Sequence, residues 1–277
     1  MNNTFNIKRF GLAFRKDLIE NGKHYLLMFF TLLGIISIVI IYVTWYNDKT
    51  NFNYRYPLNR SLLIYLSWLF IAAGIWFAST FTNSMSSKLK RISYLVSPAS
   101  NLEKYLIRWI ITTVGFIVAF FVALWIADAL RVAICSIKFP EADIKFLDIS
   151  KLVGLENEPV YREYVVPKSV FIIFLSLYFL FQSIFLLGST FCEKLSFIKT
   201  FTVVAAIIVA YIFICRWTIL LFYGNLEGYG NVLSSFVTIR NMSESISFVV
   251  TVFAVFTVIC WVLAFFRIKE SEIINRL

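Results

Sequence analysis

The chain has 277 residues, of which 60% are hydrophobic, 18% aromatic and only 15% charged. A soluble domain carries about 25% charged residues, so this composition excludes an ordinary soluble fold. The formal net charge is +10, and its distribution along the chain, described below, attributes it to membrane topology, with no need for a nucleic-acid partner.

Residues 1–24 form a basic segment with a weak apolar period. Phe10, Phe14 and Leu18 recur at four-residue spacing with mostly basic residues around them, which places the apolar side chains on one helical face. A basic amphipathic helix ahead of a long apolar run suits the membrane surface. We expect an interfacial helix here; a solvated leader helix is the alternative.

Six apolar runs follow, each close to the roughly 20 residues that a helix needs to cross the hydrocarbon core. Backbone groups in that core must be satisfied within the segment, which favours helices. Aromatic residues such as Trp45, Tyr46 and Tyr56 flank the runs as in an interfacial belt. The sequence therefore predicts an all-α integral membrane protein, one transmembrane domain over 1–277, with six spans at about 25–46, 62–81, 109–127, 169–191, 202–222 and 246–266.

Lys and Arg counts predict the orientation of these spans. The termini and the loops 85–108 and 192–199 hold 15 Lys and Arg against 6 acids, whereas the three other loops hold 10 against 10. Basic loops stay in the cytoplasm. We therefore expect a multi-pass protein of the membrane that bounds the cytoplasm, with both termini on the cytoplasmic side.

Two segments are expected on the external side. Residues 128–168 show no sustained period and suit either a small folded cap or a loop. Residues 223–245 carry three glycines and then a weakly apolar stretch, which suits either a re-entrant helix or an amphipathic loop. Both alternatives stay open for each segment.

The cytoplasmic stretch 85–108 has helix signals of its own. Basic residues leave the second span, a short apolar set follows, and Pro98 disfavours helix in the residue before it. Ser100 followed by Glu103 is a capping-box pattern, which predicts a new helix running into the third span. We call 85–108 the docking stretch, because capped short helices between two spans suit a rigid contact with a cytoplasmic partner.

The segment YLVSPASNLEKYLIR, residues 94–108, with the six-span pattern and the amphipathic entry helix, resembles the permease subunit of ATP-binding cassette exporters. The resemblance is to the drug- and polysaccharide-export class of Bacteroidetes-like bacteria. It implies a location in the bacterial inner membrane, a coupling helix between spans two and three, a second permease copy or homologue, and a nucleotide-binding ATPase subunit that carries ATP and magnesium. It also implies that the ATPase contacts Lys88, Lys90, Arg91, Tyr94, Leu95, Ser97, Pro98, Ala99, Ser100, Glu103 and Lys104. The long segment 128–168 departs from the family pattern, and a basic loop that only sets topology is the alternative reading of the docking stretch.

A second set of polar residues lies in or beside the predicted spans. Arg216 suits outward snorkelling, a polar path or a pair with Asp128. Asp128 and Arg131 are three residues apart, a spacing at which they pair on a helix. Gln182 favours helix–helix contact, which is the commoner role of a polar side chain in a span. These four residues are the candidates for an intramembrane polar site.

Several chemistries lack support in the sequence. The chain has no GxxxxGK[ST] phosphate loop, so any ATP hydrolysis belongs to another polypeptide. The four cysteines and the single His24 have no metal-ligand spacing, and we expect neither a metal nor a cofactor on this chain. The sequence thus predicts a transport subunit that is not itself an enzyme, with membrane lipid around it. The alternatives are a membrane anchor that recruits a cytoplasmic factor and an integral-membrane enzyme acting on lipids.

Overall fold

A computed structural model describes most of the chain as helix. The described residues are 94% helical and include no strand. They are residues 5–48, 60–82, 99–138, 146–147, 168–192, 195–223 and 242–274.

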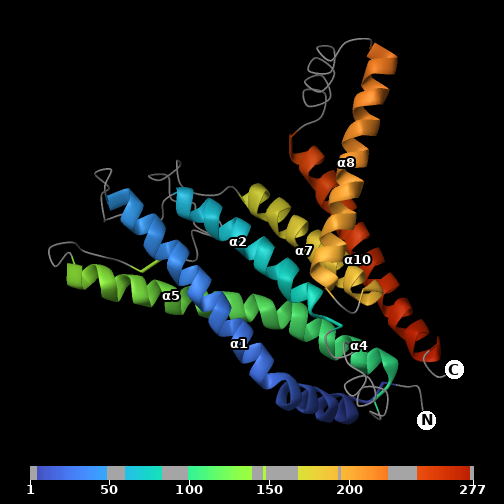
Figure 1. The fold of residues 1–277 in the computed structure, drawn as a ribbon, viewed down its shortest axis with the longest axis horizontal. Coiled ribbons are helices and arrows are strands. Elements are labelled where there is room, and N and C mark those ends of the chain that lie inside the picture. The colour runs from blue at the N-terminus through green and yellow to red at the C-terminus, as the bar shows by residue number, and fades with distance from the viewer. Residues whose placement is uncertain are drawn as a thin grey trace.

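The first helix, α1, runs without a break from Ile7 to Asp48. The sequence predicted an interfacial helix over 1–24 and a span over 25–46, and in the structure both segments belong to this one helix. Figure 1 shows that the basic N-terminal part of α1 bends away from the rest of the helix. Its position at the membrane surface stays a prediction. The basic part of the helix has local support, because Lys16 and Glu20 pair one turn apart at 3.6 Å.

Five of the described helices are long and apolar enough to cross a membrane. The helix α2, Arg60–Ser79, is not among them, since its described apolar part covers only Ile64–Ser79. A turn at Thr80 and Phe81 follows, with backbone bonds to Phe77 and Ala78. The described part of the chain therefore supports a multi-pass helical fold. The second predicted span, over 62–81, which would bring the total to six, stays a prediction.

The third predicted span belongs to one long helical rod. The rod begins with α4 (Asn101–Ile110), passes through the π-helical turn η2 (Ile111–Gly115) and continues as α5 (Phe116–Lys138). The sequence predicted the span's end near residue 127, so the helix extends 11 residues into what was expected as the external segment 128–168. The rod is longer than the predicted span because it includes the polar residues of α4 and continues past Asp128, which pairs with Arg131 inside the helix.

Three further helices complete the described chain: α7 (Lys168–Phe191), α8 (Ser196–Tyr223) and α10 (Met242–Ile274). They match the spans predicted over 169–191, 202–222 and 246–266, and α8 and α10 extend past those bounds. Leu195, just before α8, has a φ of 55°. The predicted segment 223–245 lies almost wholly outside the described residues.

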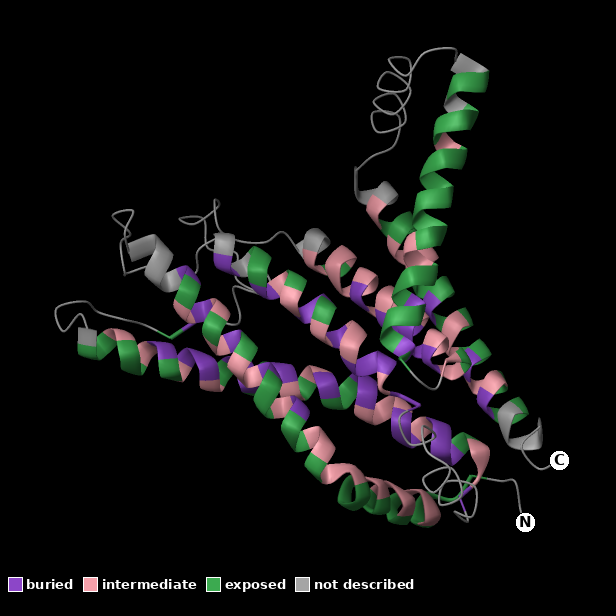
Figure 2. Ribbon diagram, viewed as in Figure 1, coloured by how far each residue is buried: buried purple, intermediate pink, exposed green. Residues whose placement is uncertain are grey.

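The main hydrophobic core lies between α1, α2, α5 and α7, and a second cluster joins α7 and α10 to the ends of α2 and α4. Figure 2 shows buried residues along α1, α2 and α5, whereas α8 is exposed over nearly all its length. In Figure 1, α8 projects away from the group formed by α1, α2 and α5. The polar starts of α1 and α4 meet at one end of this arrangement.

Candidate functional site

The start of α4 is fixed by the capping box that the sequence predicted. Ser100 has the extended backbone of an N-cap, with φ −69° and ψ 158°. Its hydroxyl accepts the Glu103 N–H at 3.3 Å, and the Glu103 carboxylate accepts the Ser100 N–H at 2.9 Å. These two bonds satisfy N–H groups that lack a partner inside the helix, so α4 begins at a defined residue. The capping-box prediction is confirmed.

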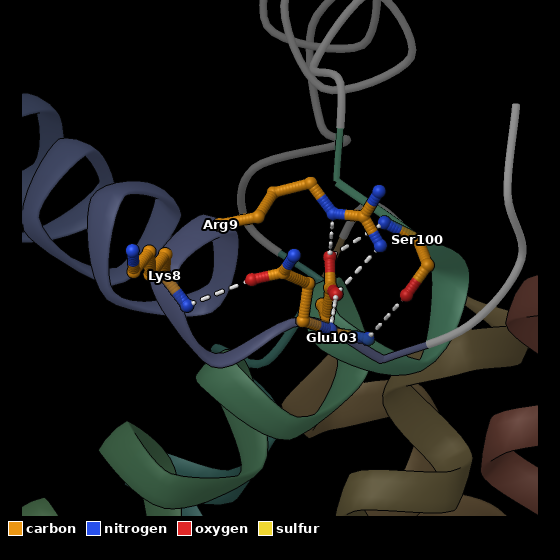
Figure 3. A network of polar contacts seen from close by, with 5 residues as sticks. Lys8, Arg9, Ser100 and Glu103 are labelled. Carbon is orange, nitrogen blue, oxygen red and sulfur yellow. Dashed lines mark hydrogen bonds and ion pairs between the residues drawn. The ribbon is translucent and has the colours of Figure 1, made fainter.

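The Glu103 carboxylate has a second set of partners, which come from the start of α1 (Figure 3). Arg9 donates from Nε to Oε2 at 2.8 Å and from Nη2 to Oε1 at 2.7 Å. The Asn6 N–H donates to Oε1 at 2.8 Å, while the Asn6 side chain accepts the Lys8 N–H at the start of α1. The Glu103 side chain is 0% exposed and that of Arg9 is 27% exposed. Glu103 therefore joins the starts of two helices with a bidentate ion pair, the strong form of this contact.

A second ion pair joins the same two helices further along. Arg108 of α4 donates to Asp17 of α1 at 2.8 Å, and both side chains are largely buried. Tyr25 and Asn21 also donate to the Asp17 carboxylate, at 2.9 and 3.0 Å. Arg108 reaches the end of α2 as well, through a 3.3 Å bond to the Phe81 carbonyl. We call the two pairs, Arg9–Glu103 and Asp17–Arg108, the α1–α4 clasp.

The clasp keeps Glu103 ionised. Its carboxylate lies at the start of a 37-residue apolar helix, ahead of the predicted span at 109–127 and outside it. The hydrogen bond from Arg9 lowers the pKa of Glu103 to about 2, with help from the N–H groups of Asn6 and Ser100 and against the effect of burial. The same pair raises the pKa of Arg9. At neutral pH the pair is fully charged.

Only part of the predicted docking set falls within the described residues. Ala99 and Lys104 are buried, Ser100 is half-buried, and the Glu103 oxygens are taken up within the chain. Leu102, which the sequence did not single out, is 43% exposed in the first turn of α4. Contact of the docking stretch with another protein stays a prediction. The remaining members of the set lie outside the described residues: Lys88, Lys90, Arg91, Tyr94, Leu95, Ser97 and Pro98.

The sequence analysis also missed Arg9 and Asp17 as partners of α4. One signal was present: α1 carries a cation and then an acid, and α4 carries an acid and then a cation. Nothing in the sequence places these helices side by side, because each pair is separated by more than 90 residues. Only the packing of α1 against α4 makes the two patterns complementary.

The four intramembrane candidates do not form one site. Asp128 and Arg131 pair at 2.7 Å, both nearly buried, and Asp128 also accepts the N–H of Leu147 at 2.7 Å. Gln182 lies elsewhere, on α7. Arg216 is exposed on α8, which Figure 1 shows well away from α5. The predicted pairing of Asp128 with Arg131 is confirmed, and the structure does not bring Arg216 to Asp128.

Gln182 connects three helices. Its amide Nε2 donates to the Thr113 hydroxyl in η2 at 2.9 Å, and its Oε1 accepts from Trp261 Nε1 of α10 at 3.3 Å. Gln182 is 0% exposed. Both ends of the amide are thus used to hold α7 between η2 and α10, the helix-joining role favoured from the sequence.

Fold and site together define a class: an all-helical protein with several helices suited to crossing a membrane and a charged clasp at one end. Comparison with known protein families, curated proteins and solved structures finds no match to this chain. Among the described residues, no group of three or more His, Cys, Asp or Glu is placed to hold a metal ion.

Proposed function

We propose that this chain is the membrane-spanning subunit of an ATP-driven exporter, whose separate ATPase subunit binds the docking stretch. One observation carries the proposal. The docking stretch ends in a capped helix that continues from Asn101 to Ile137 as one rod, about 55 Å long at 1.5 Å per residue. A push on the start of α4 therefore acts on a membrane helix directly, without a flexible joint.

The clasp supports the same function, because it couples α1 to the movement of α4. Arg9–Glu103 and Asp17–Arg108 tie the start of α1 to α4, and α1 packs along α5 further on. A displacement of α4 then carries α1 and α5 with it as one body. Rigid-body movement of one helix group against another is a common basis of switching between two states.

A second helix group offers the opposing body. Helix α7 packs against α10, α2 and α8, and Gln182 links it to η2 and α10. The π-helical turn lies where α4 passes into α5, and single π turns inside helices are frequent at functional sites. We place the change between the two states at the contacts of Gln182, where the second helix group meets the rod at η2, with alternating access as the transport mechanism.

The proposal is tested by coexpression with any ATPase that is encoded beside this gene and by affinity purification in detergent. ATPase activity is then assayed in the eluate. The docking variant is Leu102→Arg, which places a charge on an exposed apolar side chain of the first α4 turn. Its matched control is Ile137→Arg, the same change at an 83% exposed side chain near the other end of the rod.

We expect the ATPase to copurify with the wild type and the control, and at least tenfold less with Leu102→Arg, since a buried unpaired charge at an interface costs several kcal/mol. Equal recovery with both variants would move the docking site elsewhere. A stable complex without ATPase activity would favour a membrane anchor. Absence of any complex would refute the transport proposal.

A further inference from the structure

The basic part of α1 has two unlike sides. Its inner side carries Arg9 and Asp17, which bind α4 in the clasp. Phe10 and Phe14, whose spacing predicted an apolar face, are half-buried and stack on each other. Figure 2 shows half-buried residues along the inner side of this part and exposed residues along its outer side. The exposed face is therefore not the one that the four-residue apolar period indicated.

The outer side carries a row of cations with large apolar side chains between them. The row advances in steps of three and four residues, with two cations adjacent at its middle, and this spacing keeps it on one face of the helix. All of its members are exposed, the apolar Leu12 and Ile19 at 70% and 71%. We call this row the outer stripe; its members are Lys8, Leu12, Arg15, Lys16, Ile19 and Lys23.

Most of the charge on the outer stripe is not neutralised within the chain. Glu20 borders the stripe and pairs only with Lys16, at 3.6 Å. Lys8, Arg15 and Lys23 have no ion-pair partner among the described residues. The first and last cations are 15 residues apart, about 22 Å along the helix. The stripe is thus an extended positive surface and not a site for one bound ion.

The outer stripe ends where the apolar part of α1 begins. Leu26, three residues after Lys23, is 56% exposed, and Phe30 one turn further is 58% exposed. Large apolar side chains that are exposed on a membrane helix face lipid chains. The helix has 42 residues, about twice the number needed to cross the hydrocarbon core, and its basic part bends away from the rest (Figure 1). Lys23 therefore lies at the depth of the headgroups.

The composition of the outer stripe favours a lipid surface over an acidic soluble protein. Lys and Arg cover apolar surface with their stems while their charges reach the headgroups. An acidic protein would match the cations, but not the apolar Leu12 and Ile19 between them. Helices with such a face bind anionic membrane surfaces. We propose that the outer stripe binds the anionic phospholipid headgroups of one leaflet and, through the clasp on the opposite side of the helix, holds the start of α4 at that surface. The proposal involves no ATPase and does not rest on the transport function.

The experiment measures the thermal unfolding midpoint of the purified full-length protein in a non-ionic detergent, because a ligand that binds the folded state raises this midpoint. The probes are dioleoyl phosphatidylglycerol, dioleoyl phosphatidylcholine (the same chains without net charge) and polyglutamate, which is anionic but has no apolar part. The test variant combines Lys8→Gln with Lys23→Gln. The matched control combines Lys199→Gln with Lys269→Gln, the same change at two exposed lysines on α8 and α10.

We expect phosphatidylglycerol to raise the midpoint of the wild type and of the control far more than phosphatidylcholine does. Each cation at an anionic surface strengthens binding about fivefold, so the test variant should need about 20-fold more phosphatidylglycerol for half the shift. Raising the salt from 0.1 M to 0.5 M should reduce the shift, since salt screens exposed charges. The proposal fails if phosphatidylglycerol causes no shift, if phosphatidylcholine acts equally, or if the control loses as much as the test variant. A shift by polyglutamate as large as that by phosphatidylglycerol would also overturn it and indicate an acidic protein partner.

Discussion

Replacing Glu103 by Gln tests whether the α1–α4 clasp holds the start of α1. Gln at this position can keep the capping box, because a Gln side chain also accepts the N-cap N–H. It removes the charge that receives two bonds from Arg9. Since Arg9 is 27% exposed, the freed cation reaches solvent, and the cost is that of lost charged hydrogen bonds, about 2 kcal/mol.

The assay is amide hydrogen exchange of the protein in lipid nanodiscs. A loss of about 2 kcal/mol corresponds to a roughly 30-fold larger open population, and hence faster exchange, at the start of α1. We expect this increase in residues 7–14 and little change around Asp17, which the second ion pair still holds. The effect is local because the two pairs are about two helical turns apart on α1.

The matched control is Glu20→Gln, the same chemical change at a half-exposed residue whose pair with Lys16 is long, at 3.6 Å. Exposed pairs contribute at most about 1 kcal/mol, so exchange should hardly change. A double-mutant cycle with Arg9→Met isolates the pair itself. Independent, additive effects of Arg9→Met and Glu103→Gln, or equal effects of the two Glu→Gln variants, would refute the clasp.

Three further predictions follow from named contacts. The folded-state pKa of Glu103, about 2, lies below its ordinary value of 4.5. The Arg9–Glu103 pair therefore contributes fully to the stability of the α1–α4 contact above about pH 4.5, and this contribution is lost as pH falls toward 2. Spin labels on the starts of α1 and α4 should separate only in that window, and separation already at pH 6 would contradict the assignment. Gly188→Ala should lower the unfolding midpoint in a thermal melt, because the new Cβ collides with the Thr200 side chain. The loss of stability expected from such overpacking is about 1–3 kcal/mol. The control is Gly34→Ala, which has nothing within 4 Å of its new Cβ and should not lower the midpoint. Gln182→Leu should cost about 1–3 kcal/mol in the same melt, since it leaves the buried Thr113 hydroxyl and the partly buried Trp261 N–H without their partner. An unchanged midpoint would show that these contacts do not stabilise the fold.

Local signals in the sequence were reliable where the structure depends on neighbours in the chain. The Ser100–Glu103 capping box and the Asp128–Arg131 pair each span three residues, so their geometry follows from the helix alone. Hydropathy likewise located α7, α8 and α10. The continuity of α1 past His24 and the extension of α5 to Lys138 were not predicted, because the predicted spans stop at polar residues through which the helices continue.

Hydropathy also cannot determine which face of a membrane helix packs on which neighbour. In α8 apolar side chains occur all round the helix, and almost all of those that the structure describes are exposed. A soluble helix with this pattern would have to be buried, but lipid chains are as apolar as Leu, so a membrane helix loses little by facing them. Helix pairing is then decided by the few positions whose contacts lipid chains cannot replace. In this chain those positions are the close approach of Gly188 to Thr200, the amide of Gln182 and the charges of the clasp. Each depends on a partner distant in sequence. The sequence singled out Gln182 and Glu103, but it did not identify the partners with which they fix the packing of this fold.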